Sequence, residues 1–270
     1  MLDTYGRLID TIRISVTDQC NLRCFYCYIT ENKNHNNPLY NNFLSFEKLY
    51  DILKVSVSLG IKRIKITGGE PLLRENIVDF IGMIKNIDEI EDISITTNGI
   101  LLKEFAKDLK LSGLDRINVS IDSINRDIYS YITGSNELDT VLEGIEIAKN
   151  VGFDKIKINT VLLDCNKNSI DDIKKYCVSN NFSFQLINEM DLNSNKENFN
   201  NFEVTNRPPK CEFCNKIRIT AFGELIPCLF SDISYKIDFN NIAYSIEQAI
   251  NSKPIKGGKR ESKAMYEIGG

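Results

Sequence analysis

The sequence lacks three features that would place it in other classes of protein. No apolar run approaches the length of a membrane span, and the N-terminus, MLDTYGRLIDTIRIS, lacks the charged, apolar and small-residue order of a signal peptide. The formal net charge of −4 gives no basic surplus of the kind that binds nucleic acid or anionic membranes. We therefore expect a cytoplasmic protein with no membrane or nucleic-acid partner, in which local basic residues meet any anionic substrate.

Histidine is also scarce, whereas cysteine is not. The one histidine, His35, lies in the polar stretch ENKNHNNP. In a reducing cytosol, eight cysteines are better candidates for metal ligands than for disulfides. Six of them form two triplets, Cys20, Cys24 and Cys27 and then Cys211, Cys214 and Cys228. The other two, Cys165 and Cys177, are expected to be ordinary small apolar residues.

Two periodicities alternate along the first two thirds of the chain. Strand-like runs occupy residues 11–17, 61–67, 92–98, 114–122, 153–163 and 182–188. Apolar residues at helical spacing fill residues 45–60, 74–86, 101–113, 138–152 and 169–180. Strands alternating with helices predict a parallel sheet, and the fold class is α/β. We expect a partial (β/α)6 TIM-type barrel, with the active site at the C-terminal ends of its strands.

The pattern changes near residue 190. Residues 191–210 are rich in asparagine and have little periodicity, which predicts a linker or loop between a barrel of residues 1–190 and a segment of residues 211–270. In that segment, KIRITAFGELIPCLF predicts a hairpin with Gly223 in the turn, and residues 241–253 predict a short helix.

The first cysteine triplet follows the first predicted strand in the spacing CxxxCxxC. Three thiolates at this spacing can hold three irons of a [4Fe–4S] cluster and leave the fourth iron open. An open iron can chelate an amine and a carboxylate, which is the chemistry needed to bind and reductively cleave S-adenosylmethionine. Zinc is the alternative, although structural zinc normally takes four ligands in paired form.

With this motif the sequence resembles the radical S-adenosylmethionine enzymes. The glycines of KITGGEP let the backbone approach a ligand closely, and Glu70 can accept from an ammonium group. Alone, this stretch would be an ordinary turn between strand and helix, and a methionine near a strand end is more often part of the core. The resemblance implies these cofactor contacts: Tyr26 on adenine, Gly69, Glu70, Ser120 and Met190.

The second triplet has the spacing CxxC, thirteen residues and a third cysteine, in CEFCNKIRITAFGELIPC. Three thiolates at this spacing could again hold a [4Fe–4S] cluster with one open iron, and that iron could bind a substrate. The alternatives are a zinc site and a cluster with a purely structural or electron-relay role. This segment resembles the C-terminal cluster of the GTP 3′,8-cyclase family of molybdenum cofactor biosynthesis. Shared motifs extend from IRISVTDQCNLRCFYC through ITGGEPLLR, TTNG, INVSIDS, KINTV and PCLFS to the terminal Gly269-Gly270.

The resemblance implies a cofactor set and a reaction. Two [4Fe–4S] clusters and S-adenosylmethionine would generate a 5′-deoxyadenosyl radical that removes hydrogen from C3′ of GTP, after which the ribose radical adds to C8 of guanine. A one-electron reductase, flavodoxin or ferredoxin would supply the electron, and a homodimer is compatible with the sequence. The terminal glycines would enter the active site.

The triphosphate requires positive charge in this site. The residues that match the family's substrate contacts are Arg13, Lys65, Thr96, Lys157, Lys216 and Arg218, with Gly269 and Gly270. Singly, each basic residue could be the solvated end of a strand. Lys216 and Arg218 lie two apart and so share one face of a strand, where they could converge with Cys214 on one pocket.

Several departures from the family pattern bear on the substrate. Lysine replaces the family's usual arginine at Lys65 and Lys216, which loses the planar fork that suits phosphate. Gln185 and Asn188 stand where the family has an arginine and a glutamate, the 190–210 segment is short, and KPIKGG lacks the family's histidine. Two alternatives therefore stay open: a paralogue acting on another nucleotide or a peptide, and a zinc-stabilised binding module without catalysis.

Overall fold

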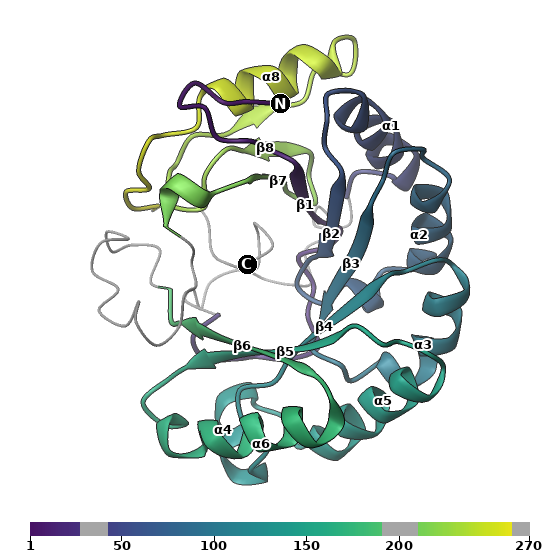
Figure 1. Cartoon of the computed structure of the whole chain (residues 1–270), viewed down its shortest axis with the longest axis vertical. Coiled ribbons are helices and arrows are strands. Elements are labelled where there is room, and N and C mark those ends of the chain that lie inside the picture. Colours follow the sequence, from purple (N-terminus) through teal and green to yellow (C-terminus); the bar gives the residue numbers. More distant parts are fainter. Residues whose placement is uncertain (28–42, 191–209, 261–270) are drawn as a thin grey trace.

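A curved parallel sheet forms the centre of the molecule, as Figure 1 shows. The structure is a computed structural model, and it describes residues 1–27, 43–190 and 210–260. All six predicted strands are present: β1 (Thr11–Ser15), β2 (Arg63–Thr67), β3 (Asp92–Thr97), β4 (Arg116–Ser120), β5 (Ile156–Leu162) and β6 (Ser183–Asn188). They pair in parallel in the spatial order β6-β5-β4-β3-β2-β1, so the expected α/β barrel order is confirmed.

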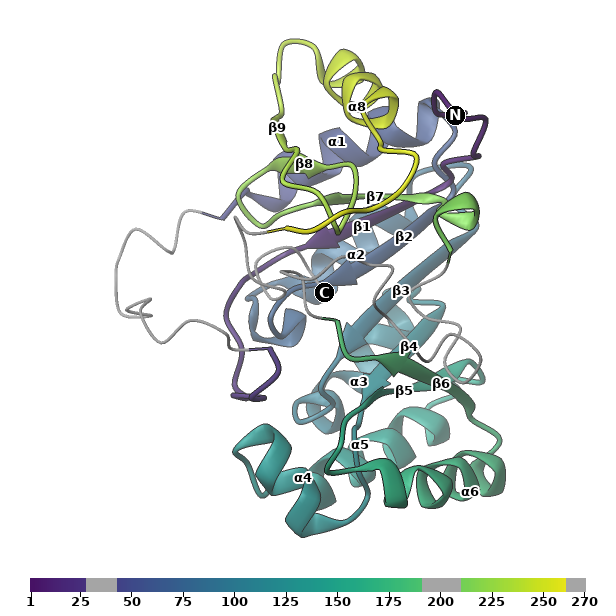
Figure 2. The ribbon, with the colours of Figure 1, turned by 90° about the vertical axis from the view of Figure 1, so that its left-hand side faces the viewer.

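Helices cover the outer, convex side of this sheet (Figures 1 and 2). The five predicted helices are present as α1 (Phe46–Ser58), α2 (Ile77–Lys85), α3 (Leu102–Leu111), α5 (Leu138–Asn150) and α6 (Ile170–Asn180). A further helix, α4 (Arg126–Thr133), was not predicted. The Asn125 side chain caps its N-terminus and Gly134 ends it at a φ of 70°, which is favourable for glycine. No helix in the described parts of the chain is long and apolar enough to cross a bilayer.

The C-terminal segment continues the same sheet. The hairpin predicted around Gly223 consists of β7 (Lys216–Ile219) and β8 (Glu224–Ile226), followed by β9 (Tyr235–Lys236) and the predicted helix α8 (Ile242–Asn251). The sequence did not predict that β7 pairs in parallel with β1, which places the hairpin at the edge of the barrel. The predicted division at 191–210 lies almost wholly outside the described residues and stays a prediction.

The two faces of the strands have opposite character. Ile12, Ile14, Ile64 and Ile66 are fully buried in the hydrophobic core, toward the helices. Between them, Arg13 is in register with Lys65 on β2 and with Arg218 on β7. Because successive side chains of a strand point to opposite faces, this row of three cations lies on the inner face. Closed TIM barrels fill their interior with apolar layers, whereas this open barrel has a polar, charged interior.

Candidate active site

A single cavity of about 310 Å³ inside the curved sheet brings most of the predicted site residues together. Its lining includes Arg13, Cys20, Cys24, Tyr26, Cys27, Lys65, Gly69, Thr96, Ser120, Lys157, Met190, Lys216 and Arg218. Glu70 is fully buried behind this lining. The thiols of the second triplet flank the cavity next to Arg218 rather than line it. Gly269 and Gly270 lie outside the described residues.

The first triplet lies in the loop after β1, at the C-terminal edge of the sheet. Cys20 accepts hydrogen bonds from the Leu22 amide at 3.4 Å and from the Asn98 side chain at 3.8 Å. Burial raises the pKa of the Cys24 thiol, and Asp122 and the neighbouring thiols of Cys27 and Cys20 raise it further. The three thiols are therefore near one another, and the surroundings of Cys20 and Cys24 favour the neutral form of these two thiols unless a metal centre binds them as thiolates.

Backbone contacts tie the KITGGEP turn to this cysteine loop. The Gly69 amide donates to the Thr17 carbonyl at 2.8 Å, and the Glu70 amide donates to the Gln19 carbonyl at 2.7 Å. A Cβ atom at Gly69 would lie 2.2 Å from the Gln19 carbonyl oxygen. This glycine is therefore required by the approach of the cysteine loop, in addition to the ligand approach expected from the sequence.

Gly69→Ala is expected to displace the cysteine loop, because the Gln19 carbonyl cannot accommodate the new methyl group. We expect a loss of about 2 kcal/mol or more in the free energy of unfolding, in the range of overpacked sites. Cleavage of S-adenosylmethionine should fall at least about tenfold. Chemical denaturation and 5′-deoxyadenosine release measure the two effects.

Gly82→Ala is the matched control for this change. A Cβ atom at Gly82, in α2, meets nothing within 4 Å. Glycine in a helix costs roughly 0.5–1 kcal/mol relative to alanine, so this variant should be slightly more stable and fully active. Equal stability of the two variants would contradict the packing role of Gly69.

Glu70 is held by three donors. Its Oε1 accepts from the Leu72 amide at 3.0 Å and the Thr97 hydroxyl at 2.8 Å, and its Oε2 accepts from the Asn98 amide at 2.7 Å. Burial raises the pKa of Glu70 to about 7, although these hydrogen bonds lower it. A carboxyl group fixed in this way beside the first triplet can accept a cationic ligand group, which would favour its charged form.

Tyr26 is fixed by a second buried acid. Its hydroxyl donates to Asp122 Oδ2 at 2.7 Å, while the Val161 amide donates to Asp122 Oδ1 at 2.7 Å. Burial raises the pKa of Asp122 to about 6, although these hydrogen bonds lower it. Sequence reasoning missed Asp122 as well as Thr97 and Asn98, although all three lie within the quoted motifs INVSIDS and TTNG.

The second triplet lies at the opposite edge of the sheet. Cys214 precedes β7, and β7 runs parallel to β1 with Lys216 opposite Thr11, so Cys214 is at the N-terminal edge while Cys20 follows the C-terminal edge. Burial alone would raise the pKa of Cys214, but the charges of Lys253, Lys216 and Arg218 bring it below its ordinary value. Burial lowers the pKa of Arg218 to about 10, so its guanidinium stays protonated at neutral pH.

No group of three or more cysteine, histidine, aspartate or glutamate side chains in the described ranges is placed to hold a single metal ion. Thiolates of a [4Fe–4S] cluster bind different irons and are spaced more widely than ligands that share one ion. His35, the remaining candidate for a zinc ligand, lies outside the described residues.

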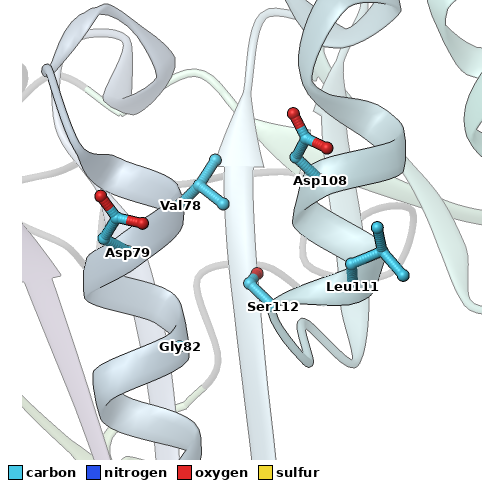
Figure 3. A pocket seen from close by; sticks show the side chains of 6 residues that line it. All are labelled: Val78, Asp79, Gly82, Asp108, Leu111 and Ser112. Carbon is cyan, nitrogen blue, oxygen red and sulfur yellow. The ribbon is translucent and has the colours of Figure 1, made fainter.

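The two cysteines outside the triplets differ in burial. Cys177 is buried in the core, as is usual for a small apolar residue, whereas Cys165 is exposed and does not pack as one. Cys165 directly follows Asp164 in the loop after β5. Figure 3 shows a separate hollow of about 580 Å³ between α2 and α3, lined by Val78, Asp79, Gly82, Asp108, Leu111 and Ser112, none of which belongs to the predicted site.

Two solved structures with the same fold contain bound S-adenosylmethionine (AdoMet). The Streptococcus suis protein SuiB bound to S-adenosylmethionine is 17% identical, with a TM-score of 0.69, covering 92% of this chain and 67% of that one. The protein anSMEcpe with bound AdoMet is also 17% identical, with a TM-score of 0.60, covering 81% of this chain and 71% of that one. At these identities the likeness shows the fold alone.

The sequence itself matches the Radical SAM superfamily over residues 14–177, which include the end of β1, the first cysteine triplet and the whole of β2 to β5. The chain is therefore a radical S-adenosylmethionine enzyme, and this class carries a [4Fe–4S] cluster together with S-adenosylmethionine.

A protein named GTP 3′,8-cyclase from Petrotoga mobilis is 34% identical over 325 residues, and one from Alkaliphilus oremlandii is 36% identical over 327 residues. Both alignments cover all of this chain and all of the relative. Within the superfamily, this chain belongs to the GTP 3′,8-cyclase family. The alignments are longer than the 270-residue chain, so the relatives carry segments that this chain lacks.

Proposed function

We propose that this protein is a GTP 3′,8-cyclase with two [4Fe–4S] clusters. The observation that carries the proposal is the placement of two thiol triplets at opposite edges of one sheet, with a cationic cavity between them. The names of the relatives from Petrotoga mobilis and Alkaliphilus oremlandii support the same activity. In this reaction a hydrogen atom would move from C3′ of GTP to the 5′-deoxyadenosyl radical, giving 5′-deoxyadenosine. The C3′ radical would then add to C8, and one further electron and one proton would convert the cyclised radical into an isomer of GTP.

The cofactor half of the site fits the group that the family requires. Cys20, Cys24 and Cys27 would hold the first cluster, Glu70 would accept the methionyl ammonium and Tyr26 would contact adenine, with Gly69, Ser120 and Met190 completing the lining. When bound, the cluster and S-adenosylmethionine supply the radical that removes hydrogen from the substrate. The residues of the chain fix the two reacting centres and exclude water. This chemistry requires a one-electron donor, for which a reductase, flavodoxin or ferredoxin is suitable.

The substrate half supplies charge. Arg13, Lys65 and Arg218 form the cationic row across β2, β1 and β7, and Lys157 adds a fourth charge from β5. We assign the triphosphate to these residues with Lys216 and Thr96, and the guanine to the second cluster on Cys211, Cys214 and Cys228. Lysine at positions 65 and 216 keeps the charge, although it binds phosphate oxygens as a point charge rather than as a fork.

A neutral donor also faces the substrate cavity. Asn188 lines the cavity and is 5% exposed, and its side-chain nitrogen has no hydrogen-bond partner among the described residues. A buried amide without a partner is costly, so a bound substrate with an acceptor atom here would satisfy it. Asn188 therefore keeps a hydrogen-bond donor in this strand, without the charge of the arginine or the glutamate that the family usually has there.

GTP carrying deuterium at C3′ tests the proposed reaction. Iron-reconstituted protein is incubated anaerobically with dithionite, S-adenosylmethionine and this substrate, and both products are analysed by mass spectrometry. We expect deuterated 5′-deoxyadenosine together with a cyclised isomer of GTP. Undeuterated 5′-deoxyadenosine with intact GTP would mean that the radical chemistry acts on another substrate, such as a different nucleotide or a peptide.

A further inference from the structure

A buried lysine bridges the two chain segments that carry the second triplet. Lys253 is 3% exposed, and its Nζ donates to the carbonyl oxygens of Lys216 at 2.9 Å and Pro227 at 2.6 Å. The same Nζ lies 3.6 Å from Cys214 Sγ. Lys216 follows Cys214 by two residues and Pro227 directly precedes Cys228. One ammonium group therefore fixes both segments relative to each other.

The chain around Lys253 contacts the other two cysteines of the triplet. The Gly257 amide donates to Cys211 Sγ at 3.3 Å, and Arg260 Nη2 donates to the Cys228 carbonyl at 3.3 Å. Residues 253–260 thus place one donor on each cysteine of the second triplet, and we call this segment the clasp. Of its four long basic side chains, Lys253 and Arg260 are buried, whereas Lys256 and Lys259 are exposed.

The N-terminal segment holds the clasp in place. The Arg7 guanidinium donates to the carbonyl oxygens of Cys211 at 3.0 Å, Pro254 at 2.9 Å and Ile255 at 3.3 Å. Its Nε donates to Asp3 Oδ2 at 2.6 Å. Arg7 therefore joins the first cysteine of the triplet to the clasp, so the geometry of this site is built from both ends of the described chain.

Charge distinguishes this site from the first triplet. Among the described residues, no carboxylate pairs with the Lys253 ammonium, and a buried cation is costly unless a negative group is close. Thiolates of an iron–sulfur cluster would supply that negative charge. The first triplet has the opposite surroundings, because its charged neighbours are the buried acids Asp122 and Glu70.

We propose that Lys253 is a positioning residue of the second cluster, that it holds the segments of Cys214 and Cys228 together, and that its charge makes this cluster the more easily reduced of the two. The inference assumes the second cluster of the proposed function. Reduction adds negative charge to a cluster, so nearby cations and N–H···S hydrogen bonds favour the reduced form and nearby carboxylates oppose it. Lys253 does not contact the reacting atoms in this scheme.

Lys253→Met tests the proposal in the reconstituted full chain. The matched control is Lys256→Met, which removes a lysine charge from an exposed position of the same clasp. Iron per chain is measured, and the reduction of each cluster is followed by electron paramagnetic resonance during an anaerobic titration. Triple-serine variants of each triplet assign the two signals.

In the wild-type and control proteins we expect the second cluster to be reduced before the first. In Lys253→Met, the ratio of reduced to oxidised second cluster at a fixed potential should fall at least about tenfold, which is about 59 mV for one electron, with the first cluster unchanged. Selective loss of the second cluster, with cleavage of S-adenosylmethionine retained, would also support the positioning role. Unchanged iron content and an unchanged titration, or a first cluster that is reduced before the second in the wild type, would overturn the proposal.

One further variant tests the role of the charge alone, and one measurement on the wild-type protein separates this proposal from the proposed function. If Lys253→Met does not fold, Lys253→Gln keeps a neutral donor, and an unchanged titration of that variant would overturn the role of the charge. If the wild-type protein binds only about four irons, or binds zinc at the second triplet, then it has no second cluster. That result would refute the two-cluster cyclase before any variant is made.

Discussion

Cys24→Ser is expected to reduce cleavage of S-adenosylmethionine to the level of the enzyme-free reaction. Cys24 is the middle cysteine of the first triplet, which we propose as the ligands of the first cluster, and its thiol is buried beside Cys20, Cys27 and Asp122. Serine is a poor iron ligand, so the variant should lose about four of about eight irons per chain. Anaerobic iron analysis and quantification of 5′-deoxyadenosine after dithionite reduction measure the two effects.

The control for this variant is Cys165→Ser. Cys165 is exposed and belongs to neither triplet, so its replacement should leave both iron content and cleavage unchanged. Full cleavage in Cys24→Ser would overturn the assignment of the first triplet. A parallel loss in the Cys165 variant would show that replacing a cysteine outside both triplets is enough to inactivate the protein, and the loss in Cys24→Ser could then not be assigned to a missing ligand.

Cys228→Ser should separate radical generation from product formation. This cysteine belongs to the second triplet, near Cys214 and Cys211, at the far edge of the sheet from the first cluster. In the proposed function its thiolate is a ligand of the substrate cluster alone, so uncoupled cleavage of S-adenosylmethionine should continue while the cyclised product disappears. The ratio of product to 5′-deoxyadenosine is the quantity to measure, because a general loss of folding would lower both together.

Two outcomes would contradict this expectation. Unchanged product formation in Cys228→Ser would show that the second triplet is not the substrate site. Complete loss of cleavage, with the first cluster still present by iron analysis, would show that the two sites are coupled in radical generation.

The parallel barrel could be predicted because the residue pattern that defines each of its strands and helices lies within a short stretch of the sequence. Strands β1 to β5 alternate buried branched apolar residues, mostly isoleucine, with polar residues, and each predicted helix places its apolar residues on one face. Helix α4 was missed because its eight residues, RDIYSYIT, are too few for that periodicity to be recognised. Its capping residues, Asn125 and Gly134, were the signal available in the sequence.

Pairing over long sequence distances could not be predicted in the same way. Nothing in KIRI specifies that its partner is TIRIS, some two hundred residues earlier, since both are short apolar alternations. The same limit explains why Lys253 was missed. A single lysine near a helix end is usually solvated, and only the approach of Lys216, Pro227 and Cys214 makes it a buried bridge.

The residues that we assign to the cofactor were easier to identify in the sequence than the residues that hold them in place. The three thiols lie close together in the sequence, and so do the residues of the KITGGEP turn. Each motif therefore shows both which chemical groups are present and where they lie. Asp122, Thr97 and Asn98 act on Tyr26 and Glu70 across the sheet, and such contacts depend on strand register rather than on motif spacing.

The pairing of β1 between β2 and β7 also sets an order for biogenesis. The contacts of the first triplet, from Gly69 to Val161, all precede residue 190, so a nascent chain can form that half of the site early. Until residues 216–219 leave the ribosome, however, one side of β1 is an unpaired strand edge, which is a template for aggregation. Strand β7 therefore protects the first strand only late in synthesis, and the half of the site proposed to generate the radical is made before the half proposed to hold the substrate.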